Sequence, residues 1–255
     1  MDDAERRGKQ RADAIERMLR EGKRPDRYLY GDRPLREEIV DEWRNADATT
    51  YAAITRNSYG CQVLNTASVM FVDVDLPELS LRETFKHALK RLFGNRGPTL
   101  REQQGIDAIA KVEEMIQADA RGGVRVYRTR GGLRYLLTHS HANPGAESTL
   151  MAMEALDADP LYVRLCKTQE CFRARLTPKP WRCGVSALHV SYPWRDGDAE
   201  EQARDWIEKY QQKTKGFATC TFLKHLGHSR VDEEIARVVD FHDDMTGAGS
   251  RLDLA

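Results

Sequence analysis

The 255-residue sequence contains no apolar run as long as a membrane-spanning helix needs, which is about 20 residues. Residues Met1–Arg7 are mostly charged and lack the apolar core of a secretory signal peptide. Internal repeats and low-complexity tracts are absent as well. From these absences we expect a cytoplasmic protein of one large domain or two small ones, without contact to a membrane.

Cysteine is scarce, with five residues in an odd count, so structural disulfides are not expected in a reducing compartment. Cys166, Cys171, Cys183 and His189 have the spacing C-x₄-C-x₁₁-C-x₅-H. This spacing lacks the C-x₂-C pair that usually begins a structural zinc site. The sequence therefore favours free cysteines that fill apolar space.

An excess of either charge is also absent, because 40 Lys and Arg residues balance 40 Asp and Glu residues. From Arg121 to Arg195, however, twelve basic residues stand against five acidic ones, a net charge of +7. From Asp196 to Ala255 eight basic residues stand against thirteen acidic ones, a net charge of −5. The basic region is predicted to bind a polyanion, with single-stranded nucleic acid as the leading choice, and its affinity should fall steeply with salt.

Arginine dominates two clusters inside this basic region. The first contains Arg125, Arg128, Arg130 and Arg134, and the second contains Arg173, Arg175, Lys179 and Arg182. The arginine fork suits bidentate recognition of phosphate. The pair Gly131–Gly132 inside the first cluster would let backbone N–H groups approach an anion closely. These features indicate a phosphate site, and a solvated basic surface is the alternative.

The most informative segment is the apolar run of residues 69–75, VMFVDVD, which reads as a buried strand that ends before Pro77. Side chains two residues apart in a strand point to the same face, so Asp73 and Asp75 are expected side by side. Two adjacent carboxylates repel each other unless a cation or a proton lies between them. Because Mg²⁺ and similar hard cations prefer oxygen ligands, the pair predicts a site for Mg²⁺ or Mn²⁺.

An Asp-x-Asp pair at a strand end also occurs as loop chemistry, in which one carboxylate caps the next helix. The position of this pair at the C-terminal edge of an apolar strand, where open α/β sheets place ligands, favours the metal or phosphate site. Removing either aspartate from the metal-free protein would relieve repulsion. We therefore expect such a change to leave stability almost unchanged or to raise it.

The remaining pattern predicts an α+β (α/β) fold with one mixed-sheet catalytic domain over residues 49–255 and a helical N-terminal extension over residues 1–48. Helices are expected over residues 4–22, 35–45, 80–93, 99–120, 148–155, 161–170, 200–211 and 232–243. Strands are expected over residues 51–55, 68–75, 124–129, 133–138, 172–176, 185–192 and 217–223. Thr99 is the expected N-cap of its helix, and His242–Asp243 is expected at a helix end.

The order of these motifs resembles the archaeo-eukaryotic primase superfamily over roughly residues 50–195. The first motif of that family is a strand that ends hydrophobic–Asp–hydrophobic–Asp, often before Pro, and residues 71–77 (FVDVDLP) match it. The second motif is a strand near Ser or Thr, with glycines and a histidine. Residues 129–134 (TRGGLR) are similar to it, but Arg134 stands where the family has the histidine.

A third stretch, with Asp157 and Asp159 ahead of Tyr162 and then residues 172–179 (FRARLTPK), resembles the Asp…Tyr…Phe-Arg-Leu…Lys stretch of eukaryotic-type primase-polymerases. The gap between Tyr162 and Phe172 is longer here than in that pattern. Either Asp157 or Asp159 would be the third metal ligand.

The resemblance implies a primase-like fold and two-metal nucleotidyl transfer. The protein would be a primase or polymerase that uses nucleoside triphosphates and Mg²⁺ or Mn²⁺ on single-stranded or primer–template nucleic acid. Asp73, Asp75 and Asp159 would be catalytic. The nucleotide would be held by Arg128, Arg130, Gly131, Gly132, Arg134, Arg173 and Lys179.

Two other functional classes stay open. One is a different metal-dependent phosphotransferase or nuclease, and the other is a non-catalytic primase-fold module that binds nucleic acid. Aromatic residues interleave with basic ones in the second half of the basic region: Phe172, Trp181, Tyr192 and Trp194. A stacking surface for unpaired bases would need such residues, and core aromatics would give the same pattern. The choice between DNA and RNA and the oligomeric state do not follow from the sequence.

Overall fold

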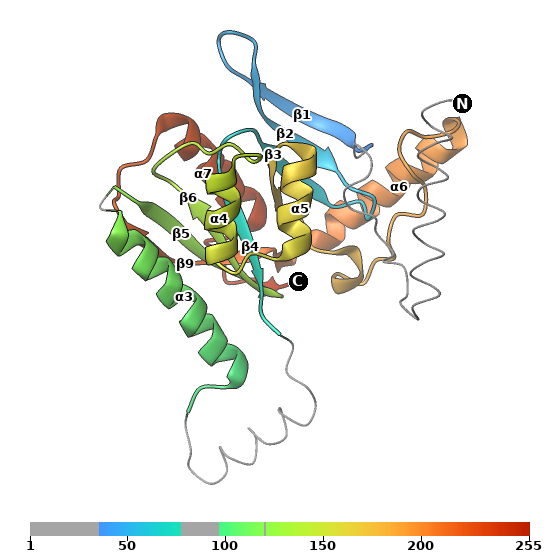
Figure 1. Cartoon of the computed structure of the whole chain (residues 1–255). Helices are drawn as coiled ribbons and strands as arrows, with labels where there is room; N and C mark the ends of the chain where they lie inside the picture. The colour runs from blue at the N-terminus through green and yellow to red at the C-terminus, as the bar shows by residue number, and fades with distance from the viewer. Residues whose placement is uncertain (1–35, 78–96, 120) are drawn as a thin grey trace, which may run out of the picture. The chain divides into compact units, whose positions relative to one another are not determined.

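Two four-stranded antiparallel sheets form the frame of the computed structural model, which describes residues 36–77, 97–119 and 121–255 (Figure 1). The first sheet has the order β1 (Glu38–Arg44), β2 (Thr50–Arg56), β3 (Gln62–Thr66) and β7 (Phe172–Arg175). The second has the order β4 (Phe71–Asp75), β6 (Gly132–Leu137), β5 (Gly123–Thr129) and β9 (Cys220–Gly227). Two short strands, β8 (Phe217–Ala218) and β10 (Asp253–Leu254), pair in parallel.

The described helices are α3 (Leu100–Ala118), α4 (Glu147–Ala155), α5 (Pro160–Gln169), α6 (Gly197–Thr214) and α7 (Glu233–Thr246), with a 3₁₀ turn at Pro180–Arg182. Helix α3 begins with a capping box, in which Thr99 Oγ1 accepts from Glu102 N and the Glu102 carboxylate accepts from Thr99 N. Aspartates cap α5, α6 and α7 in a similar way. Among the described residues, no helix is long and apolar enough to cross a membrane.

The second sheet has one apolar face. Val72 and Val74 of β4 point to this face together with Leu133 and Tyr135 of β6, and all four are buried. Helix α3 covers it, since the Tyr135 hydroxyl donates to the carbonyl oxygen of Ala108 at 3.2 Å. This apolar layer is part of the main core and anchors the strand that carries the two aspartates.

The opposite face of the second sheet carries charge. The register pairs Asp73 of β4 with Arg134 of β6, and Arg134 with Tyr127 of β5, so the three side chains share one face. Helix α7 covers this face and places the ring of His242 4.8 Å from the ring of Tyr127 and 5.3 Å from that of Phe71. Charged groups are therefore buried between β4, β6 and α7.

Strand β4 lies at the edge of the second sheet, and α5 satisfies its outer backbone edge. The carbonyl of Phe71 accepts from the Tyr162 hydroxyl at 2.9 Å, and the carbonyl of Asp73 accepts from Asp159 N at 2.9 Å. In the view of Figure 1, β4 is seen between α4 and α5. Because these bonds fix the start of α5 against β4, Asp159 comes to lie beside Asp73.

The predicted α+β class is confirmed, but the described strands form two antiparallel four-stranded sheets and one short parallel pair instead of the single mixed sheet that we expected. The helix predicted over residues 35–45 is wrong, because residues 38–44 form β1. Pairing with β2 overrides the helix propensity of the glutamates and arginines there. Trp43 packs edge-on against Phe241 at 4.6 Å. The boundary expected at residues 48/49 therefore falls inside a β-hairpin.

The other predicted elements divide into three groups. The strand expected over residues 185–192 is wrong: this segment is irregular, and Leu188 N donates to a turn carbonyl at Tyr59 instead of to a strand. The helices expected over residues 4–22 and 80–93 lie outside the described residues. The helices expected at 99–120, 148–155, 161–170, 200–211 and 232–243 and the strands expected at 51–55, 68–75, 124–129, 133–138, 172–176 and 217–223 are confirmed, with ends shifted by a few residues and a break at Thr219.

Candidate functional site

Asp73 and Arg134 form a bidentate ion pair across β4 and β6. Arg134 Nε donates to Asp73 Oδ1 at 2.7 Å, and Arg134 Nη2 donates to Asp73 Oδ2 at 3.0 Å. The Arg134 side chain is only 1% exposed, whereas that of Asp73 is 34% exposed. Burial alone would lower the pKa of Arg134, but the Asp73 charge raises it above its usual value. The protein thus supplies its own cation to Asp73.

The rest of the Arg134 guanidinium is also engaged. Its Nη1 donates to the carbonyl of Arg175 at 2.9 Å and lies 3.4 Å from His242 Nε2. With four of its five N–H groups engaged and almost no exposed surface, Arg134 is not placed to bind a phosphate in this conformation. The structure therefore supports a positioning role at Asp73 for Arg134 and gives no support to its predicted contact with the nucleotide.

His242 and Asp243 extend this network under α7. His242 Nδ1 lies 3.0 Å from Asp243 Oδ1, and the other Asp243 oxygen accepts from Arg125. These partners fit a neutral imidazole that donates from Nδ1 to Asp243 and accepts from Arg134 at Nε2. Burial, together with the Arg134 charge, lowers the pKa of His242 to about 4 against the opposing effect of Asp243.

This buried histidine predicts acid sensitivity. An unfolded histidine has a pKa of about 6.5, whereas His242 titrates at about 4 in the fold. Between these values the unfolded chain binds more protons, so this contribution to stability is full above pH 6.5 and is lost as the pH falls from 6.5 to 4. We expect a loss of about 3 kcal/mol in the free energy of unfolding from this group. Urea unfolding of wild type and His242→Gln between pH 7 and 4 measures it, and parallel curves for the two proteins would contradict the assignment.

Asp75 is the exposed carboxylate of the pair and faces the β5–β6 turn. Its register partner is Gly132, and a Cβ on Gly131 would lie 3.3 Å from Asp75 Oδ1, so these glycines leave room for the carboxylate. Desolvation raises the pKa of Asp75, and the charges of Asp159 and Asp73 raise it further. Lys179 and Arg175 oppose this effect. Asp75 therefore lies among two carboxylates and two cations.

Of the two candidates for the third carboxylate, Asp159 lies at the site and Asp157 does not. Asp159 caps α5 by accepting from Leu161 N at 3.0 Å, and its own N–H bonds to Asp73. Asp157 pairs with Lys111 of α3 and raises the pKa of Tyr135, which belongs to the apolar face of the sheet. The electrostatic effect of Asp159 on Asp75 is therefore the one that matters for the site.

Arg175 and Lys179 bring positive charge to Asp75. Arg175 Nη1 is buried and, among the described residues, has no hydrogen-bond partner. Burial lowers the pKa of Lys179, and the neighbouring charges of Arg175 and Arg182 lower it further. An unsatisfied buried guanidinium nitrogen is costly unless a ligand or water accepts from it. This pair of cations beside Asp75 is suited to an anionic ligand.

The remaining predicted phosphate ligands have other positions or partners. Arg128 alternates with Tyr127 along β5 and so points away from the face that carries Asp73. Arg130 Nη1 donates to the carbonyl of Leu254 at 3.3 Å. Arg173 is buried and donates to both Glu37 oxygens at 2.8 Å. Arg128 and Arg173 are therefore not brought to the aspartates, and Arg130 binds the C-terminal strand β10.

The glycine pair has a structural reason of its own. A Cβ on Gly132 would lie 2.0 Å from the carbonyl oxygen of Val74, so β4 and β6 approach too closely there for any side chain. Gly132 N donates to Thr129 Oγ1 at 2.9 Å and is not free for an anion. Close strand approach accounts for Gly132, and its predicted contact with phosphate stays untested.

Sequence reasoning missed two members of the site. His242 was expected only at a helix end, although it contacts Arg134 from α7. Arg175 was grouped with the basic cluster but not singled out from it. The signal for His242 was its place among the regularly spaced buried residues of α7, Ile235, Val238, Val239 and Thr246. A histidine on the buried face of a helix needs polar partners in the core.

Among residues 36–77, 97–119 and 121–255, no three His, Cys, Asp or Glu side chains are gathered tightly enough to hold a metal ion as they stand. All five cysteines are free. Mg²⁺ usually takes one or two carboxylates and completes its shell with water and substrate phosphates. Asp75 and Asp159 fit that requirement. No family model, no curated protein and no solved structure matches the chain.

Proposed function

We propose that the chain is a divalent-metal-dependent nucleotidyltransferase of the primase–polymerase type, which extends nucleic acid with nucleoside triphosphates. One observation carries the proposal: the carboxylate of Asp75 is flanked by Asp73 and Asp159 and also by the cations Arg175 and Lys179. Carboxylates attract a metal ion, and cations attract the phosphates that travel with it. The likeness of residues 71–77 to the first primase motif adds to this support.

Each side chain has a role in the proposal. Asp75 and Asp159 would hold Mg²⁺ or Mn²⁺, which supplies charge stabilisation at the reacting phosphate. Arg175 and Lys179 would bind the triphosphate, with the unpartnered Arg175 Nη1 as the first donor. Asp73 would keep its orientation through Arg134 and share its remaining lone pairs with the metal shell.

Metal binding tests the proposal directly. We expect calorimetric titration with Mn²⁺, in the presence of a non-hydrolysable nucleoside triphosphate, to show binding that Asp75→Asn and Asp159→Asn each weaken at least about tenfold. A charge-assisted contact is worth about 1.5–3 kcal/mol, which corresponds to such a factor. Asp157→Asn is the matched control and should bind like wild type, because Asp157 pairs with Lys111. Equal binding by all four proteins would sink the proposed metal site.

A further inference from the structure

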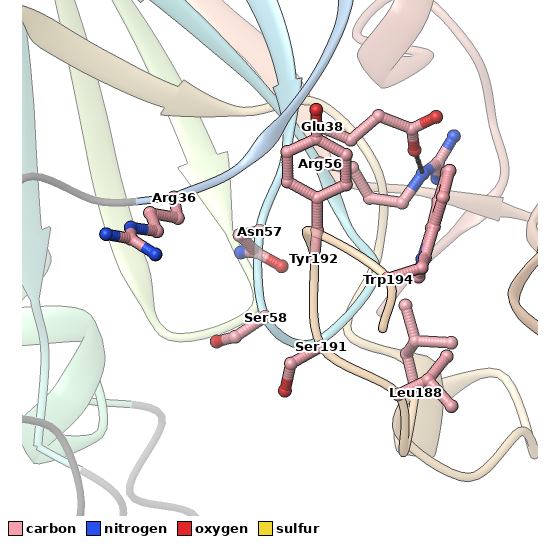
Figure 2. Close-up of a pocket in the computed structure, with 10 residues that line it drawn as sticks. Arg36, Glu38, Arg56, Asn57, Ser58, Leu188, Ser191, Tyr192 and Trp194 are labelled. Atoms are coloured by element: carbon pink, nitrogen blue, oxygen red, sulfur yellow. Dashed lines mark hydrogen bonds and ion pairs between the residues drawn. The ribbon is translucent and has the colours of Figure 1, made fainter. Parts of the chain in front are cut away.

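A pocket of about 240 Å³ opens between the first sheet and the loop that precedes α6 (Figure 2). Its lining includes Arg36, Asn57, Ser58, Ser191, Tyr192 and Trp194. None of these residues belongs to the aspartate site. The volume lies below the range of about 300–1,000 Å³ that is typical of sites for drug-sized ligands. It therefore suits one planar ring better than a whole cofactor.

The lining combines an aromatic surface with polar groups. Tyr192 is 42% exposed and meets Trp194 edge-on, with the ring centroids 5.3 Å apart. Asn57 Oδ1 accepts from two backbone N–H groups, at Tyr59 and Cys61. Among the described residues its amide nitrogen has no acceptor. Tyr192 thus offers a stacking surface, and Asn57 offers a donor to the edge of a ring.

The charge of the pocket favours an anion. The carboxylate of Glu38 is already paired, with Arg56 at 3.0 Å and with Arg204 at 3.3 Å, as the dashed line between Glu38 and Arg56 in Figure 2 illustrates. The exposed Arg36 adds a positive charge at the same pocket, and among the described residues it has no ion-pair partner. A ring with a phosphate attached would match these groups.

A continuous set of contacts links this pocket to the aspartate site. The charge of Lys179 lowers the pKa of Asp75, and its Nζ lies 5.6 Å from the ring centroid of Trp181. Trp181 is 49% exposed and meets Tyr59 edge-on at 5.2 Å. Tyr59 is the next residue after Ser58 of the pocket, and its carbonyl accepts from Leu188 N in the pocket wall. One cation, Lys179, and two aromatic rings, Trp181 and Tyr59, thus lie between the aspartate site and the pocket.

We propose that the Tyr192 pocket holds one unpaired base of a single-stranded nucleic acid, whose backbone passes Lys179 and whose next bases lie against Trp181. The inference rests on the proposed function, because the strand would serve there as the template. Surfaces that bind single strands combine positive charge along the backbone with aromatic rings on which bases stack. Trp181 and Tyr192 are the exposed aromatic side chains among the described residues.

The test uses fluorescence anisotropy of a short oligothymidylate, and of the same strand with one abasic position moved along it, in chelator and without nucleotide. For wild type, we expect two positions of the strand to be sensitive to loss of the base: the one whose base stacks on Tyr192 and the one whose base stacks on Trp181. An abasic site at either position should weaken binding about tenfold, which is the scale of one base–aromatic stack. Tyr192→Ala should bind the intact strand about tenfold more weakly. It should no longer respond to the abasic site at the Tyr192 position, but should still respond to the one at the Trp181 position. Tyr192→Phe, which keeps the ring, should behave like wild type.

Met151→Ala, an exposed apolar change on α4, is the matched control and should bind both strands like wild type. If Tyr192→Ala loses the same factor for intact and abasic strands, or none at all, the pocket is not a base site. Because no metal is present, the result does not depend on catalysis. If binding depends on the abasic position but wild type extends no primer, the proposed function is contradicted and the proposal of a base-binding pocket stands. If wild type extends primers but binding does not depend on the abasic position, only the proposal of a base-binding pocket is contradicted.

Discussion

Asp73→Asn is expected to destabilise the protein by about 3 kcal/mol, because it leaves the Arg134 guanidinium buried without a counter-charge. Removing one partner of a buried pair costs about 3–5 kcal/mol, and the partial exposure of Asp73 places the effect at the lower end. Asp75→Asn is expected to act in the opposite direction and to stabilise the metal-free protein slightly. The raised pKa of Asp75 shows that its charged form is disfavoured in the fold.

Urea unfolding at neutral pH in chelator measures both variants. The double variant Asp73→Asn/Arg134→Met provides the control, since removal of both charges should recover much of the lost stability. If Asp73→Asn unfolds at the same urea concentration as wild type, the ion pair does not contribute in solution. From the sequence, loss of either aspartate was expected to relieve repulsion. Because Asp73 pairs with Arg134, we now expect this effect only for Asp75.

The sequence indicated the strand that carries the aspartates because its signal is local. Residues 69–75 are apolar up to Asp73, and alternation within a strand places Asp73 and Asp75 on one face. Thr99 was readable as an N-cap for the same reason, because a capping box occupies four consecutive residues. Such signals depend on neighbours in the chain and not on distant partners.

The Asp73–Arg134 pair needed information that the sequence does not contain. Which residue of β6 lies opposite Asp73 is set by a strand register that joins residues 61 positions apart in the chain. A shift by one residue would have turned Arg134 to the apolar face. The prediction that Asp73 and Asp75 repel each other in the metal-free protein assumed that no cation lies beside them. The fold provides one, since Arg134 pairs with Asp73.

Strand β1 was misread for a related reason. Its glutamates and arginines favour a helix when they are considered alone. However, Glu37, just before β1, and Glu38, its first residue, pair with residues far away in the chain. Glu37 bonds Arg173 of β7, and Glu38 bonds Arg56 of β2. These ion pairs also explain why Arg173 is not available to a phosphate. Long-range pairing decided both the element and the candidate site.

In a primer-extension assay with Mn²⁺, Asp75→Asn is expected to lower the rate about a thousandfold, and this is the largest effect that the structure predicts. Loss of a metal ligand removes several kcal/mol of charge stabilisation at the reacting phosphate, and each 1.4 kcal/mol is about a factor of ten. Because this variant is expected to be at least as stable as wild type, loss of folding would not explain the loss of rate.

The same assay separates metal ligands from phosphate ligands. Lys179→Gln should raise the KM for the nucleoside triphosphate about tenfold with a smaller effect on kcat, since a lysine that binds phosphate in both the ground state and the transition state contributes mainly to binding. Asp157→Asn should extend primers at the wild-type rate, because Asp157 pairs with Lys111 on the far face of the second sheet.

If wild type extends no primer with any metal or template while it still binds single strands, the chain is a binding module. In that case the carboxylates and cations around Asp75 serve recognition and not catalysis.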